Sequence, residues 1–214
     1  MTKENLFFDL DGTIIDSSEG IFNSLRYVIK THNLFMPDEK TLNTFIGPPL
    51  HSSFERIFKV DFKTSDEFVK TYREWYSSKG VMEFSLYEGL QEVFKNLSSK
   101  YTLFVTTSKP THYAIDILKK ADVFKYFKEI SGSEKDKPDN SKQQVVDYVI
   151  DKYNLDKNTC ALIGDTKFDG EGAKLCEIDF YGVTYGFGTK EELLKFNPVK
   201  LFDTTKDIEN YFMK

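Results

Sequence analysis

The sequence predicts an α/β protein in which helices cover both faces of a parallel β-sheet and a helical segment is inserted after the first strand. Three observations lead to this fold class. A short apolar run at 6–8 ends abruptly in polar residues, as a buried strand does. Residues 16–80 then show helical periodicity without a convincing strand. From residue 87 onward strand and helix patterns alternate, which is typical of a parallel sheet between helices.

The insertion consists of helical patterns only. Four apolar residues share one face of its first helix: Ile21, Leu25, Val28 and Ile29. Further helices are expected at about 38–45, 50–58 and 65–79. The last one follows the capping box formed by Thr64 and Glu67, and it stops at Gly80.

The rest of the chain supplies the sheet and its covering helices. Strands are expected at 101–106, near 128–131, at 161–163 and at 179–184. Helices are expected at about 87–98, after Pro110, at 141–153 and at 170–177. Because the strand at 6–8 belongs to the same sheet, we expect two domains: an α/β core of residues 1–15 and 82–214, and a helical domain of residues 16–81.

Composition and charge exclude several classes of function. The 214 residues carry 29 basic and 34 acidic side chains, a net charge of -5, which argues against a nucleic-acid or anionic-membrane binder. The sequence has no apolar run long enough to span a membrane. Its two cysteines lack zinc-site spacing, and with no signal peptide they indicate a cytoplasmic protein. The arginines, at 26, 56 and 73, all lie in the insertion, so a phosphate site in the core must use lysine, hydroxyls, backbone N–H groups or a metal.

Polar residues follow three of the predicted strands. They are Asp9 and Asp11 after the first, Thr107 and Ser108 after the second, and Asp165 and Asp169 after the fourth. Ligands of open α/β sheets bind at the carboxyl ends of the strands, so we expect these side chains to converge. Four neighbouring aspartates repel one another unless a cation lies between them. Oxygen ligands without cysteine or histidine predict Mg2+ as that cation.

Three segments contain the polar residues that follow the predicted strands: Phe-Asp-Leu-Asp-Gly-Thr at 8–13, Val-Thr-Thr-Ser-Lys-Pro at 105–110 and Ile-Gly-Asp-Thr-Lys-Phe-Asp at 163–169. They resemble motifs of the haloacid dehalogenase (HAD) superfamily. The segments at 45–50 and 182–186 resemble the phosphoglycolate-phosphatase-like branch. The resemblance implies a Rossmann-like parallel sheet core with an inserted α-helical cap domain, which closes over the core during catalysis. It also implies a nucleophilic aspartate, a metal held by carboxylates and a lysine beside the phosphate.

The two aspartates of the first motif suit phosphoryl transfer. Asp9 is expected to be the nucleophile that forms an aspartyl-phosphate, and its carboxylate is expected to be ionised near neutral pH without an activating base. Asp11 is expected to protonate the leaving oxygen and later to take a proton from the attacking water. Gly12 is expected to serve the tight turn and Thr13 the packing of the backbone.

The metal and the phosphate need further ligands. Mg2+ would be held by Asp9, the backbone carbonyl of Asp11 and Asp165, with Asp169 either direct or behind them. Thr107 would donate to a phosphate oxygen, helped by the backbone N–H groups of Ser108 and residue 109.

The lysine is ambiguous in the sequence. Lys137-Pro138 resembles the Lys-Pro-x-Pro form of the motif, but Asn140 stands where the second proline would be. Lys142 opens the helix at 141–153, and its spacing to Asp165 fits the branch whose lysine begins that helix, so we favour Lys142. Lys109 is a further candidate near the phosphate, or an exposed lysine before Pro110.

These features predict a Mg2+-dependent phosphatase for small phosphomonoesters of the phosphoglycolate type. Close alternatives are a 5'-nucleotidase, a pyrophosphatase and a phosphomutase of the β-phosphoglucomutase type. A dehalogenase is disfavoured because that chemistry does not need Asp11, and a non-catalytic binding protein is disfavoured because the site residues are intact. The expected partner is a small phosphorylated metabolite, with no nucleic acid and no membrane, and the expected state is a monomer or weak dimer.

Overall fold

The computed structural model describes residues 2–46, 50–133 and 141–214, and the chain divides into two compact units. One unit comprises Met1–Asp16 and Leu86–Lys214, and the other comprises Ser17–Ser85. The chain therefore leaves the first unit once and returns to it once. The short strands β2 (Ile15–Asp16) and β3 (Ser85–Leu86) pair where the chain passes between the units.

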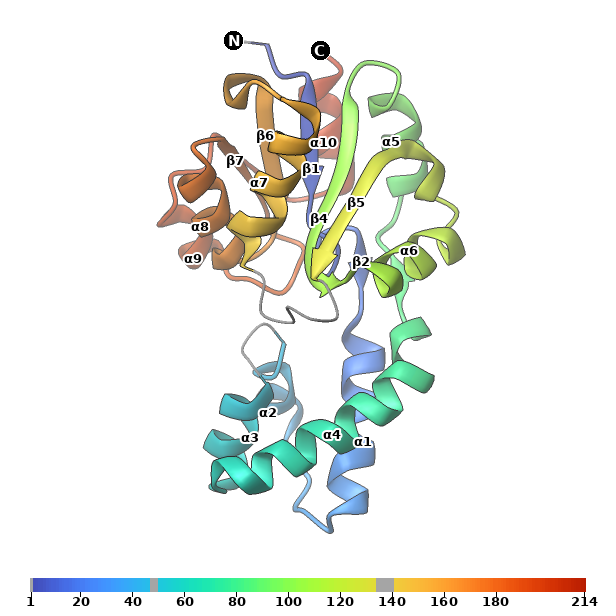
Figure 1. Cartoon of the computed structure of the whole chain (residues 1–214), viewed down its shortest axis with the longest axis vertical. Coiled ribbons are helices and arrows are strands. Elements are labelled where there is room, and N and C mark those ends of the chain that lie inside the picture. Colours follow the sequence, from blue (N-terminus) through green and yellow to red (C-terminus); the bar gives the residue numbers. More distant parts are fainter. Residues whose placement is uncertain (1, 47–49, 134–140) are drawn as a thin grey trace. The chain divides into compact units, whose positions relative to one another are not determined.

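The first unit contains a six-stranded sheet with the order β5-β4-β1-β6-β7-β8 (Figure 1). Its strands are β1 (Asn5–Phe8), β4 (Thr102–Pro110), β5 (Phe127–Ser133), β6 (Cys160–Gly164), β7 (Asp179–Val183) and β8 (Lys200–Phe202). Every neighbouring pair runs parallel. The predicted parallel α/β fold is therefore confirmed.

Helices cover both faces of this sheet. They are α5 (Leu90–Leu97), α6 (Thr111–Lys120), α7 (Lys142–Tyr153), α8 (Lys167–Cys176), α9 (Lys190–Leu194) and α10 (Thr205–Phe212), with 3-10 turns at Phe124–Tyr126 and Lys157–Thr159. Successive side chains of a strand point to opposite faces, and β1 shows this directly. Phe7 belongs to the core cluster that includes Val146 of α7 and Ala173 of α8. Phe8 instead contacts Phe94 of α5, with 5.2 Å between ring centroids.

The strand order places a topological switch beside β1. From β1 the chain builds β4 and β5 on one side, and it then crosses to β6, β7 and β8 on the other side. The carboxyl ends of β4, β1 and β6 are therefore neighbours. Ligand sites of open parallel sheets lie at this position.

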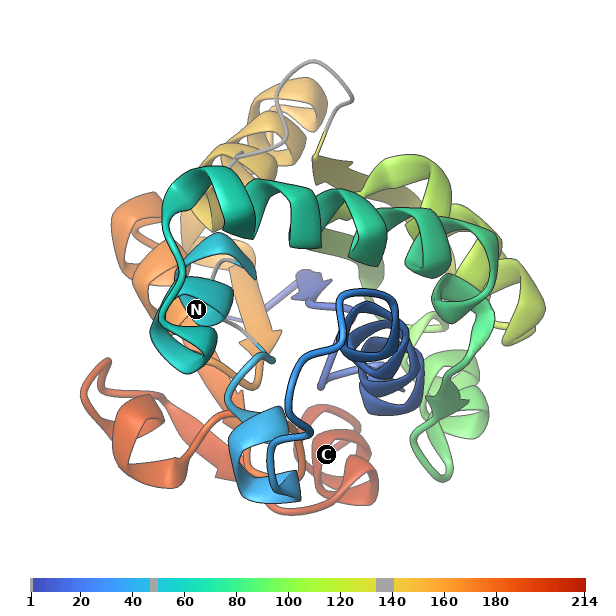
Figure 2. The ribbon, with the colours of Figure 1, turned by 90° about the horizontal axis from the view of Figure 1, so that it is seen from below.

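The second unit is helical and has its own core. It contains α1 (Ser18–Thr31), α2 (Glu39–Asn43), α3 (Leu50–Phe58), α4 (Phe62–Ser78) and a 3-10 turn at Gly80–Met82. Helix α1 packs against α4 (Figure 2), and both contribute to a buried cluster that includes Leu25, Phe54 and Phe68. Gly20 permits a close approach, because a Cβ there would collide with the carbonyl of Gly80. Among the described residues of the whole chain, no helix combines the length and the apolar character needed to cross a membrane.

Two predicted boundaries near the sheet's carboxyl edge are wrong. Strand β4 continues to Pro110, which pairs with Ser133 beyond an irregularity in register, so Thr107 and Ser108 lie within the strand rather than after it. Helix α8 begins at Lys167 instead of 170, because Thr166 and Asp169 form a capping box that starts the helix earlier. Strand β8 was not predicted at all, since its three residues give too short a pattern to recognise.

Candidate active site

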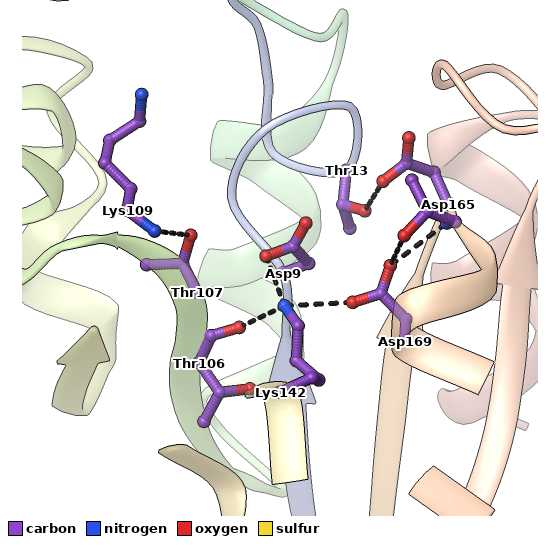
Figure 3. Close-up of polar contacts among 9 residues, drawn as sticks. Asp9, Thr13, Thr106, Thr107, Lys109, Lys142, Asp165 and Asp169 are labelled. Atoms are coloured by element: carbon purple, nitrogen blue, oxygen red, sulfur yellow. Dashed lines mark hydrogen bonds and ion pairs between the residues drawn. The ribbon is translucent and has the colours of Figure 1, made fainter. Parts of the chain in front are cut away.

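Three buried aspartates converge at the carboxyl ends of β1 and β6. Asp9 directly follows β1, Asp165 directly follows β6, and Asp169 lies in the first turn of α8. Each offers a carboxylate oxygen, and these oxygens lie within 4.8 Å of one another (Figure 3). Three of the four predicted aspartates are therefore neighbours, although they come from positions far apart in the sequence.

Donors from two different loops hold the carboxylate of Asp165. The hydroxyl of Thr13 donates to Oδ1 at 3.0 Å, and the backbone N–H of Phe187 donates to Oδ2 at 2.8 Å. The hydroxyl of Tyr185 donates to the backbone carbonyl of Thr13 at 3.0 Å. Thr13 thus contacts Asp165 through its side chain, a role that the sequence interpretation of backbone packing missed. One bond to each carboxylate oxygen leaves lone pairs on both for a cation.

The turn after β1 must come close to this carboxylate. Gly12 has φ +83°, in the left-handed region, and a Cβ at this position would collide with the Asp165 side chain. The predicted tight turn at Gly12 is therefore confirmed, with a second reason for glycine that the sequence did not show.

Asp169 is fixed by the start of its own helix. Its Oδ2 accepts from the backbone N–H of Thr166 at 3.0 Å and from the Thr166 hydroxyl at 2.8 Å. Its Oδ1 forms an ion pair with Lys142 Nζ at 2.9 Å. The capping box thus orients one oxygen of Asp169 toward the centre of the site.

Lys142 reaches the site from the first turn of α7. Ser141 caps this helix through a capping box with Gln144. The Lys142 ammonium donates to Asp9 Oδ1 at 2.6 Å and to the backbone carbonyl of Thr106 at 2.8 Å, in addition to the Asp169 ion pair. Three acceptors match the three hydrogens of an ammonium group. The alternative lysine, Lys137, lies outside the described residues.

The aliphatic part of the Lys142 side chain passes helix α8 at Gly172. A Cβ on Gly172 would lie 2.5 Å from Lys142 Cγ, so only glycine leaves room for the side chain there. The position of the ammonium therefore depends on the packing of α7 against α8.

Burial changes the ionisation of these groups. Burial first, and the neighbouring Asp169 and Asp11 after it, raise the pKa of Asp9 to about 7, although Lys142 opposes the shift. Burial and the charges of Asp169 and Asp9 raise the pKa of Asp165 well above its ordinary value. For Lys142 burial acts to lower the pKa, but the carboxylates of Asp169 and Asp9 outweigh it and raise the pKa. Without an added positive charge the pKa of Asp9 therefore lies near neutral pH, so the full ionisation that the sequence predicts there depends on a cation.

Asp11 lies apart from the three clustered aspartates. Its Oδ1 forms an ion pair with Lys109 Nζ at 3.2 Å. The Lys109 side chain is only 8% exposed, whereas that of Asp11 is 27% exposed. The reading of Lys109 as an exposed lysine is therefore wrong.

The end of β4 supplies the remaining predicted residues. Thr107 is buried, and its Oγ1 accepts from the backbone N–H of Lys109 at 3.1 Å, so the hydroxyl hydrogen can point to another acceptor. This bond engages an N–H that was expected to serve the phosphate. Ser108 is exposed, in contrast to the buried Thr106 and Thr107 that precede it in the strand.

The donor set suits a small divalent cation. The site offers carboxylate oxygens, which hard cations such as Mg2+ prefer. When all the carboxylates are ionised, the site has two more negative charges than positive ones. The negative charges are those of Asp9, Asp11, Asp165 and Asp169, and the positive charges are those of Lys109 and Lys142. A divalent cation would neutralise that excess charge and would offset the free-energy cost of burying the ionised carboxylates.

Comparisons with known proteins agree with the fold and with the family that the motifs resemble. A family model described as haloacid dehalogenase-like hydrolase matches residues 6–183. A 5'-nucleotidase from Pseudomonas aeruginosa is 35% identical over 195 residues, which cover 91% of this chain and 88% of that protein. A phosphoglycolate phosphatase from Colwellia psychrerythraea is 26% identical over 215 residues, covering 96% and 95%. A solved haloacid dehalogenase-like family hydrolase from Streptococcus pneumoniae is 36% identical, has a TM-score of 0.92 and covers 98% of both chains.

The fold is that of an α/β protein with a cluster of carboxylates at the switch point of its parallel sheet, and the family match makes it a hydrolase. The chain belongs to the haloacid dehalogenase-like hydrolase family, as its motifs predicted. The predicted class of enzyme, a phosphatase of this family, is also confirmed. Members of the family generally use Mg2+, and the buried aspartates could bind it.

Proposed function

We propose that this protein is a Mg2+-dependent phosphatase that hydrolyses small phosphomonoesters through an aspartyl-phosphate at Asp9. One observation carries the proposal: the Lys142 ammonium bonds to one oxygen of Asp9 beside the cluster of buried aspartates. A lysine on Oδ1 orients the carboxylate and leaves Oδ2 for attack. The charge balance of the site supports Mg2+ as the cofactor.

In the first step, Asp9 Oδ2 attacks the phosphorus atom of the substrate. A bond forms between Oδ2 and phosphorus, and the bond between phosphorus and the leaving oxygen breaks. Asp11 gives its proton to the leaving oxygen, so an alcohol departs. The hydroxyl of Thr107 donates to a phosphate oxygen, and Lys142 keeps the nucleophile in place and offsets negative charge.

In the second step, water attacks the phosphorus atom of the aspartyl-phosphate. Asp11 accepts a proton from that water, the bond between phosphorus and Asp9 breaks, and inorganic phosphate leaves. Mg2+ would be held by Asp9, Asp165 and the backbone carbonyl of Asp11. Asp169 would either bind the ion directly or contact the groups that bind it. When bound, Mg2+ offsets the charge of the phosphate and of the carboxylates, so that the two anions can approach each other.

The helical unit Ser17–Ser85 is proposed to act as a cap that selects the leaving group and excludes water. It holds Arg26, Arg56 and Arg73, so an arginine contact to a substrate would come from this unit. The cytoplasmic location and the monomeric or weakly dimeric state remain predictions of the sequence.

Phosphoglycolate is the first substrate to test, because a phosphoglycolate phosphatase is similar over almost the whole chain. Nucleoside 5'-monophosphates are the second, because the 5'-nucleotidase from Pseudomonas aeruginosa has the higher identity of the two relatives. Both are small phosphomonoesters and would use the same core chemistry.

The test is hydrolysis of p-nitrophenyl phosphate with Mg2+ and with EDTA. Turnover with Mg2+ that EDTA abolishes is the expected result, and absence of metal-dependent turnover would refute the proposal. A panel of phosphoglycolate, nucleoside monophosphates, pyrophosphate and a sugar phosphate, compared by kcat/KM, then identifies the substrate class. Release of inorganic phosphate without an added sugar bisphosphate separates a phosphatase from a phosphomutase.

A further inference from the structure

We propose that Lys109 is a positioning residue for Asp11, holding its carboxylate where it exchanges a proton with the leaving oxygen of the substrate. The inference rests on the proposed function, because it takes Asp11 as the general acid and base. It assigns to Lys109 a role separate from that of Lys142: one lysine serves the nucleophile and the other serves the proton donor.

The backbone of Asp11 is already fixed by the turn that follows β1. The N–H of Gly12 donates to the carbonyl of Ile15 at 2.7 Å, and the N–H groups of Ile14 and Ile15 donate to the carbonyl of Leu10 at 2.9 and 3.0 Å. Residues 11 and 15 also form an isolated β-bridge. The remaining freedom of Asp11 is therefore that of its side chain, and a side-chain contact decides where its carboxylate lies.

Lys109 makes such a contact from the neighbouring strand. Strand β4, which carries Lys109, pairs with β1, which precedes Asp11, and the ion pair bridges their carboxyl ends at 3.2 Å. The backbone of Lys109 is tied to Thr107 by a hydrogen bond of 3.1 Å. The lysine therefore approaches Asp11 from a fixed part of the sheet.

The pair is unequally buried. The lysine side chain is 8% exposed and the aspartate side chain is 27% exposed. The ammonium is thus held inside the protein, while part of the carboxylate remains accessible to a substrate or to water. The surface pair of Lys206 and Glu209 is arranged differently, because its lysine side chain is 65% exposed.

Electrostatics explain why Asp11 needs a cation of its own. Asp9, Asp165 and Asp169 lie together nearby, and the Lys142 ammonium is engaged by Asp9, Asp169 and a backbone carbonyl. Repulsion from this cluster acts on the Asp11 carboxylate. Lys109 attracts the Asp11 carboxylate from the β4 side, and this attraction holds the Asp11 side chain in place against the repulsion.

This role predicts an effect that depends on the leaving group. An alkyl phosphate needs protonation of its leaving oxygen, whereas p-nitrophenolate departs readily without a proton. Loss of the Asp11 position should therefore slow an alkyl phosphate far more than p-nitrophenyl phosphate. A general loss of packing or of phosphate binding would slow both substrates equally.

The experiment compares kcat/KM of wild type, Lys109→Met and Lys109→Arg on ethyl phosphate and on p-nitrophenyl phosphate, at saturating Mg2+. General acid catalysis contributes about 100- to 10,000-fold, and loss of its positioning should remove roughly 10- to 100-fold of that on ethyl phosphate. For p-nitrophenyl phosphate we expect a loss of less than about 3-fold in Lys109→Met. Lys109→Arg should recover part of the ethyl phosphate activity, and the control Lys206→Met should behave as wild type on both substrates.

Two results would overturn the inference while leaving the proposed phosphatase intact. One is an equal loss on the two substrates, which would make Lys109 a ligand of the phosphoryl group or a purely structural residue. The other is a wild-type rate of Lys109→Met on ethyl phosphate, which would show that the position of the Asp11 carboxylate does not depend on this lysine. The proposed function itself fails if wild type shows no Mg2+-dependent turnover of p-nitrophenyl phosphate, so the two failures are distinguishable.

Discussion

Replacing Lys142 by methionine should strongly destabilise the metal-free protein. The substitution keeps most of the stem that passes Gly172 but removes the ammonium that bonds to Asp9, Asp169 and the carbonyl of Thr106. Both carboxylates are buried, and removing one partner of a buried ion pair typically destabilises by about 3–5 kcal/mol. In a chain of this size each kcal/mol lowers the melting temperature by about 2–4 °C, so the expected loss is roughly 6–20 °C.

The assay is thermal unfolding in EDTA, monitored by circular dichroism, with Lys152→Met as the matched control. Lys152 lies in the same helix and pairs with Glu129 at 2.8 Å, but its side chain is 41% exposed, so its removal should change the melting temperature little. Added Mg2+ should recover part of the loss in Lys142→Met, because a divalent cation also neutralises the carboxylates. A Lys142→Met protein that melts in EDTA at the wild-type temperature would refute the assignment of this lysine as their counter-ion.

Three further predictions address the same carboxylates. Asp9→Asn should abolish turnover with Mg2+ while keeping the circular dichroism spectrum of wild type, and a variant with near-full activity would remove Asp9 as the nucleophile. The pKa of Asp9 is about 7 in the folded protein, against an ordinary value of 3.8. Between these two pH values the folded state binds more protons than the unfolded state. The free energy of unfolding in EDTA should therefore fall as pH rises from about 4 to about 7. Mg2+ should flatten that dependence, and a metal-free stability that rises over this window would contradict the burial argument. Lys142→Ala should lose far more activity than Lys137→Ala, and the reverse ranking would transfer the role to Lys137.

The sequence was sufficient for the parallel fold and for the convergence of Asp9, Asp165 and Asp169, whereas Asp11 lies apart from these three. Apolar strands that end in polar residues have a strong pattern, and the parallel sheet then brings Asp9 and Asp165 to one edge whatever their separation in the chain. The place of Lys142 at the start of a helix and its spacing to Asp165 favour it over Lys137 as the lysine of the site. These inferences depend on local sequence patterns and on the order of the strands, and both can be predicted from the periodicity of apolar residues.

The contacts that orient the site could not be read in the same way. The bonds from Thr13 and Phe187 to Asp165 join three separate loops, and no spacing in the sequence relates them. The segment at 182–186 shows only a family resemblance in the sequence, and nothing in it indicates that Tyr185 donates a hydrogen bond to the Thr13 carbonyl. For Lys109 the sequence leaves two interpretations open, a lysine near the phosphate or an exposed one, because its burial depends on neighbouring strands. The capping box at Thr166 and Asp169 is a missed signal that the sequence did contain, since its spacing is local.

Detection of the covalent intermediate at Asp9 tests the central claim most directly. Asp11→Asn should slow hydrolysis of the aspartyl-phosphate, so incubation of this variant with p-nitrophenyl phosphate and Mg2+, acid quenching and peptide mass spectrometry should find one added phosphoryl group on Asp9. The same experiment in EDTA, and with Asp9→Asn, should find none. A protein that turns over substrate with Mg2+ but carries its phosphoryl group on a residue other than Asp9 would contradict the account.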